Sequence, residues 1–251
     1  MTESQTTLDG RWALVTGAGK RIGACVARTL HAAGCNVAIH YRGSKGPALS
    51  IANELNAARP GSAITVGADL LDIAGLPALV EEIIEQTGRL DILINNASSF
   101  YPTPIGEITE DQWDDLIGTN LKAPLFLSQA CVPHLREAGG SIINIVDIHA
   151  ARPLRHHTIY GPAKAGLAML TRTLARDLAP QVRVNGVSPG AILWPEDGMT
   201  DSVKNTIIKQ VPLQRPGEPS DIAGCILYLV RDAVYVTGQI IAIDGGRSVG
   251  W

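Results

Sequence analysis

The sequence of 251 residues lacks the features that mark secreted, membrane-spanning and metal-binding proteins. No apolar run approaches the roughly 18 residues that cross a bilayer, and the opening MTESQTTLDGR does not have the basic-then-apolar order of a secretory signal. The four cysteines form no CxxC pair, and the histidines at 149, 156 and 157 have no metal-ligand spacing. The net charge of -3 gives no indication of a nucleic-acid partner. We therefore expect a cytoplasmic protein without metal, membrane or nucleic-acid partners.

What the sequence does contain is an alternation of short apolar runs and longer amphipathic segments. The longer segments repeat apolar residues at spacings of three and four, as helices do, and the short runs are typical of strands covered on both faces. This predicts a Rossmann-like α/β fold, a doubly wound parallel sheet of seven strands with helices on both faces, in a single domain over residues 1–251. The expected strands are 12–16, 36–41, 63–67, 91–95, 141–146, 182–187 and 240–243. The expected helices are 22–33, 45–58, 76–87, 110–137, 158–178 and 220–230.

A glycine-rich turn, TGAGKRIG at residues 16–23, joins the first expected strand to the first helix. Glycine allows the backbone to approach a pyrophosphate closely, and the helix N-terminus offers free N–H groups to it. The spacing differs from GxGxxG because the last glycine comes one residue late. The alternative interpretation is a tight strand–helix turn without a ligand. The position after the first strand of an α/β chain favours a dinucleotide site.

The end of the second expected strand indicates which dinucleotide binds. An NAD site usually has an acidic residue there for the ribose hydroxyls, whereas this chain has His40-Tyr41-Arg42-Gly43-Ser44. Arg42, with Ser44 and His40 as donors and Lys20 nearby, suits a 2′-phosphate. The alternative is that Arg42 is a solvated loop residue. NADPH is the favoured cofactor.

Further motifs follow the later strands. These are Asp69-Leu70, Asn95-Asn96-Ala97, Asn120 within a long helix, Tyr160-Gly161-Pro162-Ala163-Lys164, and Pro189-Gly190. Together with the glycine turn they resemble the short-chain dehydrogenase/reductase family over essentially the whole chain. The resemblance implies a homotetramer, with helices 110–137 and 158–178 at its interfaces. The residues expected to bind the cofactor are Gly17, Lys20, Arg21, Ile22, His40, Tyr41, Arg42, Ser44, Asp69, Leu70, Asn95, Ala97, Ser98, Tyr160, Lys164, Pro189, Gly190 and Ile192.

Tyr160 and Lys164 are the expected centre of the chemistry, with Asn120 as a further catalytic residue from the resemblance. A spacing of four at the start of a helix points both side chains the same way. A free tyrosine has a pKa of about 10, so we expect the ammonium to lower it and make Tyr160 a better proton relay. The alternative is a core tyrosine beside a surface lysine.

Two residues depart from the general family pattern: Arg21 replaces a glycine, and Asp147 replaces a serine. A carboxylate pairs well with the amino-pyrimidine edge of a heterocycle. With the segment Asn95–Pro104, NNASSFYPTP, these residues resemble the pteridine reductases. The resemblance implies that Phe100 stacks on a pterin and that Ser98 contacts it. The expected substrate-binding residues are Arg21, Ser98, Phe100, Asp147, Tyr160 and Trp194; the expected catalytic residues are Asp147, Tyr160, Lys164 and Asn120.

The resulting hypothesis is NADPH-dependent reduction of dihydropterins, and of oxidised pterins and dihydrofolate, to the tetrahydro form. One alternative is a reductase of simple carbonyls, such as an oxoacyl thioester or a ketone. A second is a non-catalytic NADPH-binding sensor, although such proteins tend to lose the tyrosine or the lysine. The segment 191–199 is expected to cover the substrate, with Trp194 either on the pterin tail or in a packing role. The terminal Trp251 is expected near a neighbouring subunit's site.

Overall fold

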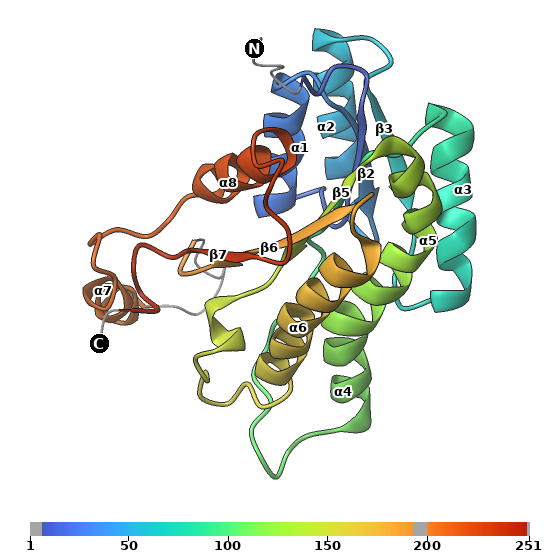
Figure 1. Ribbon diagram of the computed structural model, residues 1–251. Helices are drawn as coiled ribbons and strands as arrows, with labels where there is room; N and C mark the ends of the chain where they lie inside the picture. Colours follow the sequence, from blue (N-terminus) through green and yellow to red (C-terminus); the bar gives the residue numbers. More distant parts are fainter. Residues whose placement is uncertain (1–6, 193–199, 250–251) are drawn as a thin grey trace.

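Seven parallel strands form the centre of the computed structural model, which describes residues 7–192 and 200–249 (Figure 1). They pair in the order β3-β2-β1-β4-β5-β6-β7, with Ala13 of β1 opposite Val37 of β2 and Ile92 of β4. The predicted Rossmann-like sheet is confirmed, and each predicted strand is present with ends shifted by at most two residues. The strands are β1 Trp12–Val15, β2 Asn36–Tyr41, β3 Ala63–Gly67, β4 Ile92–Asn95, β5 Ser141–Ile145, β6 Arg183–Pro189 and β7 Ile240–Ile243.

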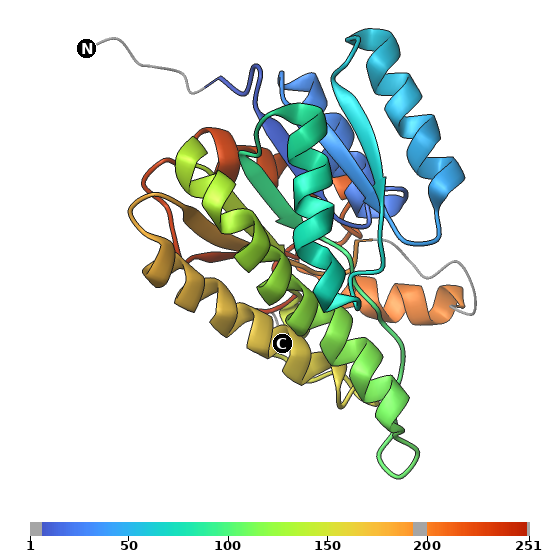
Figure 2. The same cartoon turned by 90° about the vertical axis from the view of Figure 1, so that its right-hand side faces the viewer.

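Helices cover both faces of the sheet (Figure 2). One hydrophobic cluster joins the strands to α1, α2 and α8, and a second joins them to α3, α5 and α6. The helices are α1 Arg21–Ala32, α2 Lys45–Ala58, α3 Leu76–Thr87, α4 Glu110–Ile117, α5 Ala123–Ala138, α6 Tyr160–Leu178, α7 Asp201–Lys209 and α8 Pro219–Arg231. Short 3-10 turns lie at Ile73–Gly75 and Ile148–Ala150. No helix among the described residues is long and apolar enough to span a bilayer.

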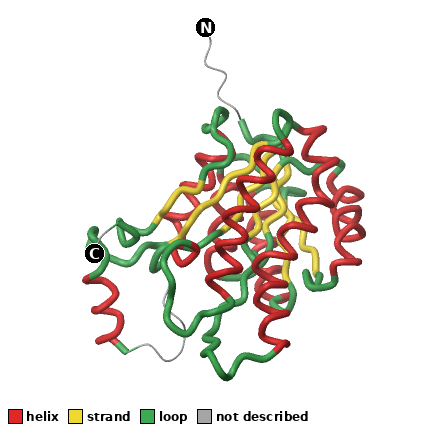
Figure 3. The backbone as a smooth tube through the Cα atoms, turned by 60° about the horizontal axis from the view of Figure 1, so that its bottom comes forward, coloured by secondary structure: helices red, strands yellow, loops and turns green. Residues whose placement is uncertain are grey.

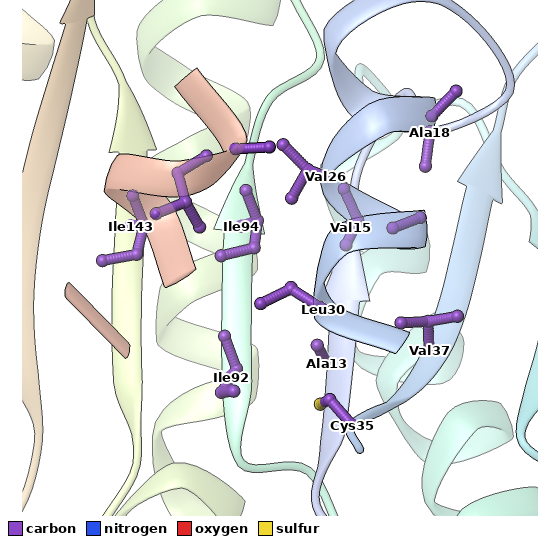
Figure 4. Packing of buried hydrophobic residues seen from close by; sticks show 14 of the residues in the cluster. Ala13, Val15, Ala18, Val26, Leu30, Cys35, Val37, Ile92, Ile94 and Ile143 are labelled. Atoms are coloured by element: carbon purple, nitrogen blue, oxygen red, sulfur yellow. The ribbon is translucent and has the colours of Figure 1, made fainter. Parts of the chain in front are cut away.

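The core follows the two-residue period of the strands. In β1, Ala13 and Val15 face the cluster of α1, whereas Leu14 faces the cluster of α3. Figure 4 shows Val15 and Ile94 beside Val26 and Leu30 of α1 on the first face. Apolar residues on both faces explain why the strands read as near-continuous apolar runs. Burial of this kind fixes the sheet and leaves its carboxyl edge free to carry polar groups.

The prediction of a single helix over residues 110–137 is wrong. The structure divides it into α4, a π-helical turn at Gly118–Lys122, and α5. Pro124 has no N–H to donate to the carbonyl of Asn120 four residues earlier, and its ring crowds that carbonyl. The backbone N–H of Ala123 instead reaches the carbonyl of Gly118, which gives the wider turn. The interruption places Asn120 in an irregular segment.

Helix α7 is an element that the sequence did not predict. Its residues, DSVKNTIIK, have a short apolar pattern, and none of them is buried. Thr200 caps the helix by accepting the backbone N–H of Val203. Figures 1 and 3 show α7 standing apart from the helices that cover the sheet. It therefore contributes to the carboxyl edge and little to the core.

Candidate active site

A cavity of about 440 Å³ opens at the carboxyl ends of β1, β2 and β4. The sheet order leads away from β1 and β4 in opposite directions, and open α/β sheets bind ligands at such a point. Its walls come from the glycine turn, the β2–α2 turn and the segments after β3 and β4. Of the residues predicted to bind the cofactor, the lining includes Gly17, Lys20, Arg21, Ile22, His40, Arg42, Ser44, Asp69, Leu70, Ala97 and Ser98.

The glycine turn brings backbone to the cavity wall without intervening side chains. Gly17 has a φ of +62°, and a Cβ there would lie 3.1 Å from the Cα of Ala97. A Cβ at Gly23 would lie 2.5 Å from Nδ2 of Asn96. Arg21 has a φ of 53°, a left-handed conformation that favours glycine and costs about 1 kcal/mol with a side chain. The chain thus keeps an arginine at a strained position beside the cavity.

The β2–α2 turn supplies polar groups on one side of the cavity. Arg42 and Ser44 both line it, as does Lys20 from the glycine turn. The Arg42 guanidinium lies 3.9 Å from the Asp69 carboxylate and its side chain is 58% exposed, so it can turn toward an anion. Tyr41 points away from this cavity, against Gly67, where a Cβ would lie 2.9 Å from the phenol. Alternation along β2 turns the Tyr41 side chain to the other face, so the prediction that Tyr41 binds the cofactor stays a prediction for its backbone.

His40 is buried and does not act as a phosphate donor, contrary to the prediction. Its Nδ1 accepts the backbone N–H of Gly17 at 3.2 Å, and its Nε2 donates to the carbonyl of Ala68 at 3.1 Å. Burial lowers the pKa of His40 to about 4, so the neutral tautomer with the proton on Nε2 fits both contacts. Its imidazole holds the glycine turn against β2 and the end of β3.

The Asn95-Asn96 pair divides its side chains between core and cavity. Asn95 is buried, and its Nδ2 donates to Asn144 at 2.8 Å and to Ser128 at 3.3 Å. Asn95 therefore uses its side chain within the core, and the prediction that it binds the cofactor stays a prediction for its backbone. Asn96, which the sequence reasoning did not select, lines the cavity and donates to the carbonyl of Thr16 at 2.8 Å. The two-residue period of a strand allows one asparagine of the pair to face the cavity.

Asp147, Tyr160 and Lys164 come together at the ends of β5 and α6. The Tyr160 hydroxyl donates to Oδ2 of Asp147 at 2.9 Å. The Lys164 ammonium donates to the carbonyl of Ile145 at 2.8 Å and lies 5.7 Å from the centroid of the Tyr160 ring. Tyr160 is 4% and Lys164 2% exposed, so these groups interact in a largely water-excluded setting.

The pKa of Tyr160 moves in the direction opposite to the prediction. Burial raises it most, and the charge of Asp147 and the hydrogen bond to that carboxylate raise it further, whereas a hydrogen bond with Ser98 lowers it. Burial also lowers the pKa of Lys164 to about 8, against the charge of Asp147. The neighbouring carboxylate thus dominates the ammonium and keeps the phenol protonated. The Tyr160 phenol therefore carries a proton at neutral pH.

Asn120 positions the segment after β4. Its Oδ1 accepts the hydroxyl of Ser98 at 2.6 Å, and its Nδ2 donates to the carbonyls of Ser99 at 2.9 Å and Leu116 at 3.0 Å. With its amide engaged in this way, the buried side chain acts on the site through Ser98. The predicted catalytic role of Asn120 is therefore a positioning role as far as its side chain is concerned.

Phe100 lies beside Tyr160, as the predicted substrate site requires. The two rings are 4.8 Å apart in an edge-to-face arrangement, and Phe100 is 50% exposed. A second ring, His157, stacks on Phe100 at 4.7 Å with an interplanar angle of 19°. Sequence reasoning treated His157 as a loop residue, and only its position three residues before Tyr160 pointed to a role in the site. His157 supports Phe100 and defines an aromatic wall next to the tyrosine.

The remaining predicted residues follow β6. Pro189 ends that strand, and the backbone N–H of Gly190 donates to the carbonyl of Ile243 at 3.0 Å. Ile192 is buried against the segment around Gly217. None of these three described residues lines the 440 Å³ cavity. Trp194, most of the segment 191–199, and Trp251 lie outside the described residues.

A family model described as enoyl-(acyl carrier protein) reductase matches residues 17–248. Pteridine reductase 1 of Leishmania tarentolae is 40% identical over 278 residues, which cover 94% of this chain and 96% of that protein. The 3-oxoacyl-[acyl-carrier-protein] reductase FabG of Staphylococcus aureus is 37% identical over 238 residues, which cover 93% of this chain and 96% of that protein.

Among solved structures, a blue fluorescent protein from a metagenomic library in complex with NADPH has a TM-score of 0.90 and 36% identity. The match covers 96% of this chain and 99% of that one. The fold is therefore shared along nearly the whole length of both chains.

Proposed function

Because this chain belongs to the short-chain dehydrogenase/reductase family, we propose that it is an NADPH-dependent reductase of pterins. The substrates proposed are dihydropterins, together with oxidised pterins and dihydrofolate, and the products are the tetrahydro forms. The reductase class follows from the family. The pterin ring and the choice of NADPH are the specific parts of the proposal.

The hydrogen bond between Asp147 and Tyr160 is the observation that carries the pterin assignment. A carboxylate that holds a tyrosine hydroxyl is a poor partner for a ketone oxygen, since it accepts hydrogen bonds and repels developing negative charge. The N–H groups of an amino-pyrimidine edge are donors and match it. Phe100 supplies a half-exposed ring beside the same tyrosine, and a flat heterocycle stacks on such a ring. Pteridine reductase 1 of Leishmania tarentolae is consistent with this choice at 40% identity.

The cavity at the glycine turn fits NADPH. Gly17 and Gly23 leave backbone room for a pyrophosphate, and Lys20, Arg21 and Arg42 offer three cations around the cavity against the single carboxylate of Asp69. The solved relative with 36% identity is a complex with NADPH. When bound, the nicotinamide supplies the hydride.

The chain's own groups orient the substrate and hold the proton. Asp147 and Phe100 fix the edge and the face of the ring, which lowers the entropic part of the barrier. Tyr160 keeps its proton because burial and Asp147 raise its pKa, which also makes it a weak acid. It can donate this proton to a ring nitrogen of an oxidised pterin once hydride transfer to the neighbouring carbon has made that nitrogen strongly basic. For the dihydro substrate we propose that water supplies the proton. Lys164 is placed under the tyrosine ring by the carbonyl of Ile145 and holds the nicotinamide ribose in the proposed complex.

A homotetramer is part of the proposal. Two exposed apolar side chains, Trp113 on α4 at 51% and Met169 on α6 at 60%, support it, because these helices carry the interfaces that the family resemblance implies. Burial of such side chains between copies of the chain would remove apolar surface from water.

A carbonyl reductase is the second candidate. The 37% identity to a 3-oxoacyl-[acyl-carrier-protein] reductase and the family description favour it. Its substrates would place a thioester or ketone oxygen where Asp147 now meets Tyr160.

An NADPH-oxidation assay separates the two candidates. We expect turnover of dihydrobiopterin, dihydromonapterin and dihydrofolate, and of biopterin more slowly, with little turnover of oxoacyl thioesters. Asp147→Ser should lower kcat/KM for the pterins by at least about 100-fold, since it removes a charge-assisted contact and the partner of Tyr160. Asp232→Ser, which changes an exposed carboxylate on the surface, is the matched control. Rapid oxidation of NADPH with ketones and none with dihydropterins would make the pterin proposal wrong.

A further inference from the structure

A second cavity, of about 580 Å³, lies next to Asp147. Three segments that are far apart in the sequence build it: the turn after β5, the end of α7, and the segment after β7. Its lining includes Ile148, His149, Arg152, Lys209, Pro212 and Arg247. None of the motifs used to predict the cofactor site falls in this lining. The proposed binding of NADPH and of the pterin ring therefore does not account for this cavity.

One carboxylate, that of Asp147, connects the lining of this cavity to the candidate active site by hydrogen bonds. Oδ2 of Asp147 accepts the Tyr160 hydroxyl, and Oδ1 accepts the backbone N–H of His149 at 2.8 Å. His149 belongs to the cavity lining, so the wall begins two residues beyond Asp147. The charge of Asp147 also acts on Arg247, where it opposes the lowering of the pKa of that guanidinium by burial. A molecule held by Asp147 therefore has this cavity beside it.

The charge of the lining is one-sided. Arg152, Lys209 and Arg247 are cations, and among the lining residues that the structure describes there is no aspartate or glutamate. The chain as a whole carries a net charge of -3, so this excess of positive charge is local. Two carboxylates outside the lining, those of Asp147 and Asp244, act on Arg247 and offset part of it. Grouped cations repel one another in a cavity that is partly shielded from water, and an anion bound there would relieve this repulsion.

Two of these cations, Arg152 and Arg247, contact segments other than their own across the cavity wall. Nη2 of Arg152 donates to the carbonyl of Ser248 at 2.6 Å, which ties the turn after β5 to the segment after β7. Nη2 of Arg247 lies 3.5 Å from Oε1 of Gln210 at the end of α7. Ile148 and Pro212 add apolar surface between the charged groups. The site thus offers apolar contact near Asp147 and guanidinium and ammonium groups around it, which suits a carboxylate carried on an apolar spacer.

We infer that this cavity binds the carboxylate end of the substrate's side chain, so that the chain favours dihydropterins with an acidic tail over those with a neutral one. The inference rests on the proposed function, because it takes the pterin ring to be held at Asp147. Dihydrofolate carries two carboxylates on a glutamate beyond an aromatic spacer, and dihydrobiopterin carries a neutral diol. The aromatic spacer lies along Ile148 and Pro212, and the carboxylates reach Lys209 and Arg247.

The test compares KM values for the two substrates in variants that remove one positive charge each. Lys209→Gln and Arg247→Gln should each raise KM for dihydrofolate about tenfold, the effect of losing one charge-assisted contact. KM for dihydrobiopterin should change by less than about twofold, and kcat at saturation with either substrate should stay the same. Lys204→Gln removes a lysine from α7 that does not line the cavity, and it serves as the matched control. Raising the salt concentration should reduce the preference for dihydrofolate in the unmodified protein.

Three outcomes separate the inference from the proposed function. If dihydrobiopterin is turned over and KM for dihydrofolate is the same in all four proteins, the tail site is refuted while the pterin reductase stands. If no dihydropterin is turned over, the proposed function itself fails. A dihydropterin phosphate provides a further arm: a tenfold rise of its KM in the two variants, with none for dihydrofolate, would refute the carboxylate assignment in favour of a phosphate. Competition by p-aminobenzoylglutamate, lost in Arg247→Gln, would support the inference without relying on turnover.

Discussion

The residue with the clearest conflict between stability and chemistry is Lys164. It is 2% exposed, and burial lowers its pKa to about 8, so the folded chain holds its charged form at a disadvantage at neutral pH. The usual lysine pKa of 10.5 applies to the unfolded chain, and a difference of this size costs about 3 kcal/mol at pH 7. The hydrogen bond to the carbonyl of Ile145 offsets about 1 kcal/mol of this loss of stability. The fold does not gain stability from this charge, and the proposed role of Lys164 in the active site accounts for its presence.

Lys164→Met is therefore expected to stabilise the protein and inactivate it. The free energy of unfolding in urea at pH 7 should rise by about 2 kcal/mol, and NADPH oxidation should fall at least about 100-fold. The gain should shrink as the pH is raised toward 10, because the ammonium in the unfolded chain then loses its proton too. Lys122→Met, at an exposed lysine of the π-helical turn, is the control and should change neither quantity appreciably. A less stable Lys164→Met protein would contradict this account of the buried charge.

Different elements supply the backbone and the side-chain groups that line the cavity at the glycine turn. The glycine turn and α1 bring backbone to the cavity, and the β2–α2 turn brings side chains. Arg42-Gly43-Ser44 lies between a strand end and a helix start, where the chain can present charge without disturbing the core. We therefore expect the proposed preference for NADPH over NADH to depend on this turn.

Arg42→Ala should raise KM for NADPH by about 10- to 100-fold and leave KM for NADH within about twofold. The reason is the loss of a charge-assisted hydrogen bond to the 2′-phosphate, which NADH does not have. Steady-state kinetics with each cofactor measure this directly. Lys45→Ala, a few residues later at the start of α2, is the control because Lys45 does not line the cavity. Equal losses with both cofactors would mean that Arg42 supports the fold and does not read the phosphate.

The strands and the order of motifs could be predicted from sequence because each depends on neighbours in the chain. Apolar runs such as Ile142–Ile145 indicate buried strands by themselves. The division at Gly118–Lys122 could not be predicted from the apolar pattern, which continues through Pro124. The positions of Asn95, His40 and His157 depend on contacts with segments far along the chain, so sequence assigned the first two to the cofactor and gave the third no role.

At the scale of the whole molecule, His40 connects three parts of the sheet edge. Its imidazole joins β2 to the glycine turn and to the segment after β3. Its pKa of about 4 in the folded chain lies below the 6.5 of a free imidazole, so the unfolded chain takes up the proton first as the pH falls. The stability contributed by the neutral imidazole is therefore complete above pH 6.5 and is lost as the pH falls toward 4.

The free energy of unfolding should consequently decrease more steeply with acid in the unmodified protein than in His40→Asn. Asparagine can accept the N–H of Gly17 but does not titrate. Between pH 7 and pH 5 the extra loss should be about 2 kcal/mol, measured by urea unfolding at both pH values. The variant is expected to be the less stable protein at pH 7, since it gives up the contact with Ala68. Parallel pH dependences in the two proteins would show that His40 is not the group responsible.

The segment after β7 has a practical consequence for how the protein is handled. The Asp244 carboxylate accepts the backbone N–H groups of Gly246 and Ser248, and Ser248 in turn accepts from Arg152. Arg247 therefore stands in the wall of the basic cavity, four residues before the last residue of the sequence. Val249, the last residue that the structure describes, comes two residues after Arg247, so an affinity tag or fusion partner at the C-terminus would follow the cavity wall closely along the chain, whereas one at the N-terminus would be far from it in the sequence. Assays of substrate preference should use the second arrangement.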